Sequence, residues 1–150
     1  LPSVLPEVSD EAWTQFVRAM VIAAPSVVSP SNAVGMFELT PRRLGDLGVV
    51  QKLARSKRGP RTVWVAIFVP PLTCAQFLNS PGIQYGVFSR SMRDYDTRAQ
   101  TGAFGDPGGL SRSGALAVLH RCGPSGLSSW TQGERFPATE QLVERVDGVF

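Results

Sequence analysis

The sequence predicts a mainly α-helical domain of six to eight short helices with little or no sheet. Apolar residues recur at helical spacing in several segments, and residues typical of helix starts and ends separate these segments. Of the 150 residues, 43% are hydrophobic and 18% are charged, which is enough apolar material for a packed core. A chain of this length is expected to form a single domain over residues 1–150.

The first helix is expected over residues 9–24, after an extended arm of residues 1–8. Ser9 can accept hydrogen bonds from the first backbone amides, and two acidic residues follow it at the positive end of the helix dipole. Pro25 is expected to end this helix. Its buried face is predicted from the apolar residues at helical spacing, which are Trp13, Phe16, Val17, Met20, Val21 and Ala24.

A loop and a short helix are expected next. Residues 25–32 are rich in Pro, Ser and Asn, which favour loops. Thr40 can cap a helix that begins at Pro41 and ends at Gly48, and this helix would bury its two leucines.

The following segment carries conflicting signals. Residues 49–62 are basic and are predicted to form a helix that breaks at Gly59–Pro60. Residues 63–69 have the β-branched composition of a strand, but no second strand is evident to pair with them. A short buried helix or an extended segment is therefore expected there.

The second half of the chain is expected to be helical apart from one loop. Residues 101–111 include four glycines and a proline, which predicts a flexible loop. The expected helices are residues 72–79, a longer helix from Ser80–Pro81, residues 111–122 with a break at Gly123–Pro124, a short turn carrying Leu127 and Trp130, and an amphipathic final segment, 137–150.

Basic residues gather between positions 42 and 61, where Asp46 is the acidic exception. A cluster of this kind could contact nucleic acid, an anionic glycan or an acidic protein, and a solvated surface is the alternative. Its members are Arg42, Arg43, Lys52, Arg55, Lys57, Arg58 and Arg61.

No metal site and no cofactor are expected. Two cysteines, Cys74 and Cys122, permit one disulfide without requiring it, and a single histidine, His120, makes a zinc site improbable. His120 falls in a predicted buried helix, where a hydrogen-bonded core residue is favoured over a catalytic base. No apolar run reaches the ~18 uncharged residues of a membrane span, and no signal peptide is visible.

Residues 28–48, VSPSNAVGMFELTPRRLGDLG, resemble the central motif of soluble lytic transglycosylases and goose-type lysozymes. In that family a loop of the form V-S-P-x-G-A-x-G-L-M-Q-L-x-P leads to a short helix that ends in L-G. Residues 115–130 are similar to a second stretch of the family, A-L-A-A-Y-N-A-G-P-G-x-V. The resemblance implies a lysozyme-like fold with a groove. The residues in register are Val28, Ser29, Pro30, Ala33, Gly35, Leu39, Pro41, Gly48, Ala115, Leu116, Ala117, Gly123 and Pro124.

The polar positions of the family differ in this chain. Glycoside cleavage needs a carboxylic acid that can give a proton to the leaving oxygen. In the family this Glu ends the first helix, upstream of the motif's central glycine, and the same spacing from Gly35 leads to Met20 here. A thioether has no proton to give, and losing general acid catalysis typically costs ~10²–10⁴-fold in rate. Glu38 replaces the family's Gln, and His120–Arg121 replace its Tyr-Asn.

Glu38 has two interpretations. It could have taken over as the acid, because the apolar neighbours Met36 and Phe37 would favour its protonated form. Alternatively, it is a solvated carboxylate or one paired with Arg121, which would favour the charged form and disqualify it as a proton donor. Residues 94–98, DYDTR, are expected to be a solvated helix end rather than a metal site.

The leading interpretation is a lysozyme-like module without the catalytic Glu. It would be a structural part of a phage virion (tail or ejection apparatus) or of a cell-wall-crossing secretion assembly in the periplasm or outside the cell. Other structural proteins of that assembly, and peptidoglycan, would be its partners. An active peptidoglycan transglycosylase or muramidase that uses Glu38, and a basic virion protein that contacts nucleic acid, remain as alternatives. The predicted groove consists of Gly35, Met36, Phe37, Glu38, His120 and Arg121.

Overall fold

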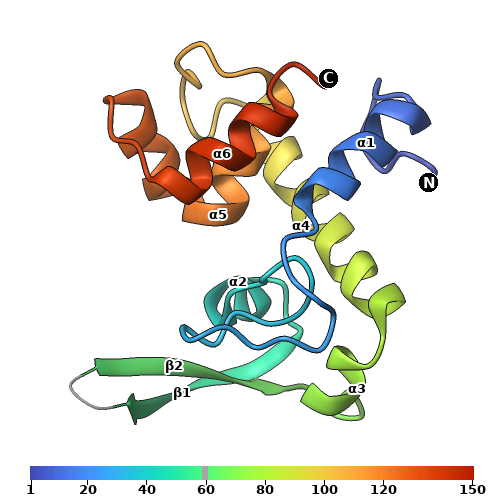
Figure 1. Ribbon diagram of the computed structural model, residues 1–150, viewed down its shortest axis with the longest axis vertical. Coiled ribbons are helices and arrows are strands. Elements are labelled where there is room, and N and C mark those ends of the chain that lie inside the picture. Colours follow the sequence, from blue (N-terminus) through green and yellow to red (C-terminus); the bar gives the residue numbers. More distant parts are fainter. Residues whose placement is uncertain (59–60) are drawn as a thin grey trace. The chain divides into compact units, whose positions relative to one another are not determined.

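The computed structural model describes the backbone of residues 1–58 and 61–150, and the side chains of residues 1–51 and 67–150. The described part of the chain is mainly helical, so the predicted fold class is confirmed (Figure 1). In chain order its elements are α1 (Asp10–Met20), α2 (Pro41–Asp46), β1 (Val50–Arg58), β2 (Arg61–Phe68), α3 (Cys74–Leu78), α4 (Pro81–Gln100), α5 (Arg112–Thr131) and α6 (Pro137–Val146).

Backbone contacts divide the chain into two units. The terminal unit comprises Leu1–Met20 and Met92–Phe150, and the central unit comprises Val21–Ser91. Helix α4 begins in the central unit and ends in the terminal unit. Each unit therefore draws on residues from this helix, and each is described separately below.

In the terminal unit, α1 is an amphipathic helix whose start follows the prediction. The Ser9 hydroxyl accepts a hydrogen bond from the Ala12 amide at 3.2 Å, which satisfies one of the free donors of the first turn. One face of α1 is buried, and Phe16 packs edge-on against Phe150 with ring centroids 5.1 Å apart. The buried residues of this helix are Trp13, Phe16, Val17 and Met20.

Helix α1 ends at Met20, earlier than the predicted end at Ala24. The amides of Ile22 and Ala23 donate to the carbonyl oxygen of Met36 at 2.9 and 3.2 Å instead of continuing the helix. Val21 and Ala24 are consequently exposed, and their predicted burial is wrong. A tertiary contact here overrides the local helical pattern.

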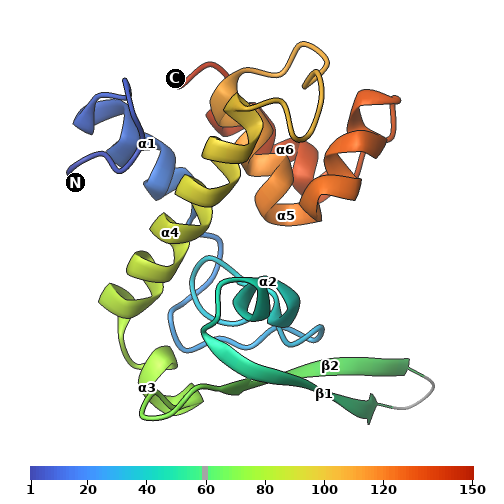
Figure 2. The same cartoon turned by 180° about the vertical axis from the view of Figure 1, so that it is seen from behind.

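Helices α5 and α6 form most of the remaining terminal unit. The loop over residues 101–111 joins α4 to α5, as predicted (Figure 2). Gly123 has the non-helical angles φ 70° and ψ −176°, and Pro124 follows it, so the predicted break in α5 is confirmed. Helix α6 packs against α5 through its apolar face, which buries Leu142, Val143 and Val146 as expected.

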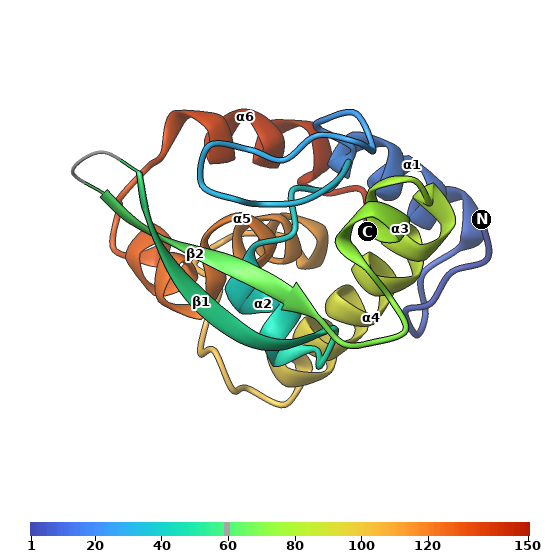
Figure 3. The same ribbon diagram turned by 90° about the horizontal axis from the view of Figure 1, so that it is seen from below.

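The central unit contains an antiparallel hairpin that the sequence interpretation missed. Strands β1 and β2 pair from Val50 opposite Phe68 to Arg58 opposite Arg61, and both pack on α2 (Figure 3). The predicted helix over residues 49–62 is therefore wrong, and the segment after it is a strand. Strand β2, for which the sequence indicated no partner, pairs with β1, the segment immediately before it.

The short helices of the central unit begin with the predicted signals. The Thr40 hydroxyl accepts a hydrogen bond from the Arg43 amide at 3.1 Å, with Pro41 in the first turn. Thr73 caps α3 in the same way, and its backbone amide is bound in return by the Gln76 side chain. Among the described helices, none is both long and apolar enough to cross a membrane.

Candidate functional site

The loop over residues 28–39, whose sequence resembles the family motif, folds back on itself. Val34 and Leu39 exchange two backbone hydrogen bonds of 2.9 and 3.0 Å, which close a tight turn over residues 35–38. Ser29 binds Ala33 twice, through its backbone amide and through its hydroxyl. The motif residues thus build a fixed turn in the central unit.

The Gln84 side chain, from α4, holds this loop from the inside. It is fully buried, and its Oε1 accepts a hydrogen bond from the Met36 amide at 2.8 Å. Its Nε2 donates to the carbonyl oxygens of Pro25 at 2.9 Å and Phe77 at 2.8 Å. One amide side chain therefore ties the loop to the end of α3, and sequence periodicity gave no sign of this role.

Gly35 is required where the loop meets Gln84. Its φ is +80°, a conformation that residues with a side chain rarely adopt. A Cβ at this position would lie 2.3 Å from Oε1 of Gln84, which is far inside van der Waals contact. The glycine that aligns with the family motif thus has a structural explanation in this chain.

The turn places its side chains in different surroundings. Phe37 is buried and stacks on Phe88 with centroids 4.1 Å apart and an interplanar angle of 10°. Met36 and Glu38 are half-buried. Glu38 has a positive φ of 48°, which is uncommon for a residue other than glycine.

The other predicted site residues lie in the terminal unit. Met20 is the last residue of α1 and is 0% exposed. His120 is buried in α5, and Arg121 beside it is half-buried. The predicted groove residues therefore belong to two units, with Gly35, Met36, Phe37 and Glu38 in the central unit and His120 and Arg121 in the terminal unit.

The predicted basic surface is corrected at one position. Arg43 is 6% exposed, and its Nε donates to the Ser91 hydroxyl at 2.7 Å while Nη2 donates to the Ser91 carbonyl at 3.0 Å. Arg43 therefore anchors α2 to α4 within the central unit, whereas Arg42 is exposed. The side chains of the remaining members lie outside the described residues, and the backbone places them in the hairpin strands: Lys52, Arg55, Lys57, Arg58 and Arg61.

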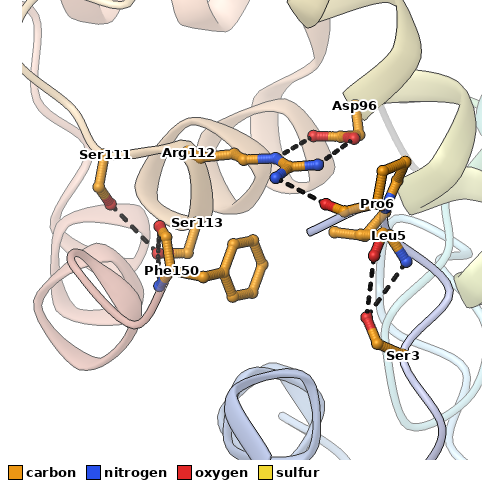
Figure 4. A network of polar contacts seen from close by, with 8 residues as sticks. All are labelled: Ser3, Leu5, Pro6, Asp96, Ser111, Arg112, Ser113 and Phe150. Carbon is orange, nitrogen blue, oxygen red and sulfur yellow. Dashed lines mark hydrogen bonds and ion pairs between the residues drawn. The ribbon is translucent and has the colours of Figure 1, made fainter. Parts of the chain in front are cut away.

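The end of α4, predicted to be solvated, is exposed at Thr97 and Arg98, but Asp96 within it belongs to a partly buried ion pair. Asp96 is 3% exposed, and its two carboxylate oxygens accept hydrogen bonds from Nε and Nη2 of Arg112, each at 2.7 Å (Figure 4). Nη1 of Arg112 donates to the Pro6 carbonyl at 3.0 Å. The hydrogen bond to Asp96 raises the pKa of the Arg112 guanidinium above its usual value, although partial burial opposes this shift.

A cavity of about 260 Å³ lies beside this pair, within the terminal unit. The last turns of α4, the following loop and α5 enclose it. Its lining is mostly apolar apart from Asp96, Arg112 and Gln100. No sequence pattern predicted this site, because the glycine-rich loop separates the paired residues along the chain and neither residue belongs to a known motif.

Comparisons with protein-family models, with curated proteins and with solved structures found no match for this chain.

Proposed function

We propose that this chain is a non-catalytic lysozyme-like module, a structural component of a phage virion or of a cell-wall-crossing secretion assembly. In that role it would dock on other proteins of the assembly and contact peptidoglycan. The proposal combines the motif resemblance with the chemistry of the residue at the acid position.

The arrangement of the motif supports the resemblance. A helix ends at Met20, a closed turn that begins at Gly35 follows, and a short helix capped by Thr40 is succeeded by Leu47–Gly48. This is the order of elements expected for the family. The matching residues shape the loop, which is what a retained fold requires.

The observation that carries the absence of catalysis is the identity and burial of Met20. It ends α1, the position from which the family's Glu acts, and its side chain is fully buried. A thioether can neither donate a proton nor stabilise an oxocarbenium ion by charge. Without that group the fold retains a shape and a surface but loses its principal chemical step.

An active glycosidase that uses Glu38 is the second candidate. Its half-buried carboxylate and its left-handed backbone at φ 48° favour this reading, because strained residues cluster at functional sites. Against it, Glu38 lies on a turn of the central unit, whereas the family's acid ends the first helix, which in this chain is α1 of the terminal unit.

Clearing of purified peptidoglycan sacculi distinguishes the two candidates. Wild-type protein, Glu38→Gln and the control Glu140→Gln, which changes an exposed carboxylate of α6, would be compared at equal concentration. The proposal predicts that none of the three lowers the turbidity. Clearing by wild type and Glu140→Gln that Glu38→Gln abolishes would establish the glycosidase and overturn the proposal.

A further inference from the structure

The cavity in the terminal unit combines an apolar lining with a few polar groups, as small-molecule sites do. The inference drawn from it does not depend on the proposed function. Its lining includes three residues buried in the core, Ala115, Leu116 and Leu127. Phe104 and Pro107 of the loop and the exposed Gln100 also line it. A volume of about 260 Å³ would hold roughly nine waters at ~30 Å³ each, which suits a ligand of about ten heavy atoms.

The polar wall of the cavity is electrically balanced. Both oxygens of Asp96 are bound by Arg112, so the charge of the guanidinium is already neutralised by a buried carboxylate. An anionic ligand would compete with Asp96 and would gain little from a pair whose net charge is zero. A cationic ligand would meet the guanidinium directly. The pair therefore favours an uncharged ligand.

Arg112 nevertheless retains hydrogen-bonding capacity. A guanidinium has five N–H groups, and three of those of Arg112 bind Asp96 and the Pro6 carbonyl. Two N–H groups, one on each Nη, are left without an acceptor in the described part of the chain, and 23% of this side chain is exposed. An acceptor oxygen on a ligand can take these donors.

Gln100 supplies the complementary group. Its side chain lines the cavity, is exposed, and makes no hydrogen bond within the described residues. Its amide oxygen can accept a hydrogen bond from a ligand N–H group. A donor pair at Arg112 and an acceptor at Gln100, set in apolar walls, match a ligand that carries a carbonyl oxygen and an N–H group next to an apolar body.

We propose that this cavity binds a small uncharged amide, with its apolar part between Phe104 and Leu116, its carbonyl oxygen on Arg112 and its N–H group on Gln100. The positions of Phe104 and Arg98 support an ordered wall. The guanidinium carbon of Arg98 lies 4.8 Å from the centre of the Phe104 ring, and Tyr95 contacts the ring edge-on with centroids 6.1 Å apart.

Three probes of nearly equal size test the proposal with the intact chain. N-methylbenzamide has both groups, methyl benzoate lacks the N–H group, and benzoate is charged. Titration of ¹⁵N-labelled protein is expected to give saturable shifts at Ala99, Gln100, Gly105 and Arg112 with the amide. The ester and benzoate are expected to bind at least about fivefold more weakly, the loss of one hydrogen bond of ~1 kcal/mol.

Variants locate the binding and separate it from folding. Ala99→Leu fills the cavity and is expected to abolish the shifts, whereas Ala103→Leu, in the exposed part of the loop, is expected to leave them unchanged. Gln100→Leu should reduce the affinity for the amide to that for the ester. Absence of saturable shifts in the wild type, equal affinity for the three probes, or wild-type binding by Ala99→Leu would each overturn the proposal.

Discussion

The Gln84 side chain offers the sharpest test of how the motif loop is held. Gln84→Met keeps nearly the same length and volume but removes the amide. The substitution leaves the Met36 amide and the carbonyls of Pro25 and Phe77 without this partner. The hydrogen bond to the Phe77 carbonyl is buried, and losing it should cost ~1–3 kcal/mol. The hydrogen bonds of the Met36 amide and the Pro25 carbonyl are partly buried, and losing them should cost about 1 kcal/mol each. The expected loss in the free energy of unfolding is therefore about 3–5 kcal/mol.

Urea denaturation and thermal unfolding, followed by circular dichroism, measure this loss. At ~2–4 °C per kcal/mol for a chain of this size, the midpoint temperature should fall by about 6–20 °C. Gln100→Met is the matched control, because Gln100 ends the same helix with an exposed side chain that makes no hydrogen bond within the described residues. It should change stability by no more than ~0.5 kcal/mol. If Gln84→Met were as stable as Gln100→Met, the hydrogen bonds of the Gln84 side chain would make no net contribution to stability.

Further predictions concern a glycine, an ion pair and a thiol. Gly35→Ala should lower the free energy of unfolding, measured by urea denaturation, by about 3–4 kcal/mol, because the new Cβ adds an overlap with the Gln84 side chain to the strain of a positive φ. Gly102→Ala is the control: its φ is +82° but the space around it is open, so only the backbone strain of ~1–2 kcal/mol is expected. Equal losses would show that the overlap is relieved at no cost. Asp96→Asn should lower the free energy of unfolding by about 2–3 kcal/mol in the same assay, because the partly buried guanidinium of Arg112 loses its counter-charge. Asp94→Asn, which changes an exposed ion pair, should lower it by at most ~1 kcal/mol. Similar values for the two would contradict a buried role for Asp96. Partial burial raises the pKa of the Cys74 thiol, so a smaller fraction of it is thiolate at pH 8 in the native protein. Iodoacetamide should therefore alkylate Cys74 more slowly in native than in urea-unfolded protein, as followed by mass spectrometry. A faster reaction of the native protein would contradict this.

Local signals in the sequence predicted the helix starts well. Ser9, Thr40 and the Gly123–Pro124 break act through short-range hydrogen bonding and backbone geometry, which neighbouring residues determine. The hairpin was missed because Lys, Arg, Leu and Ala in its first strand have good helix propensity, and the pairing that overrides it is a tertiary property.

The candidate sites were only partly predictable for a similar reason. The motif showed where a tight turn would lie, but Gln84 is far along the chain from the loop that it holds. Burial of Arg43 and Asp96 likewise depends on partners contributed by other segments, Ser91 and Arg112. The sequence pattern alone predicts that a charged residue in a helix is exposed to solvent, because its burial requires a partner that only the folded structure places beside it.

Release of soluble muropeptides from purified sacculi, measured by mass spectrometry after prolonged incubation, tests the inert-module account most directly. Under the proposed function, in which the buried Met20 at the end of α1 replaces the proton donor, wild-type protein should release no more muropeptide than a heat-denatured sample. The proposed contact with peptidoglycan predicts that it also sediments with the sacculi. Release of anhydro- or reducing-end muropeptides in proportion to the concentration of native protein would contradict the account.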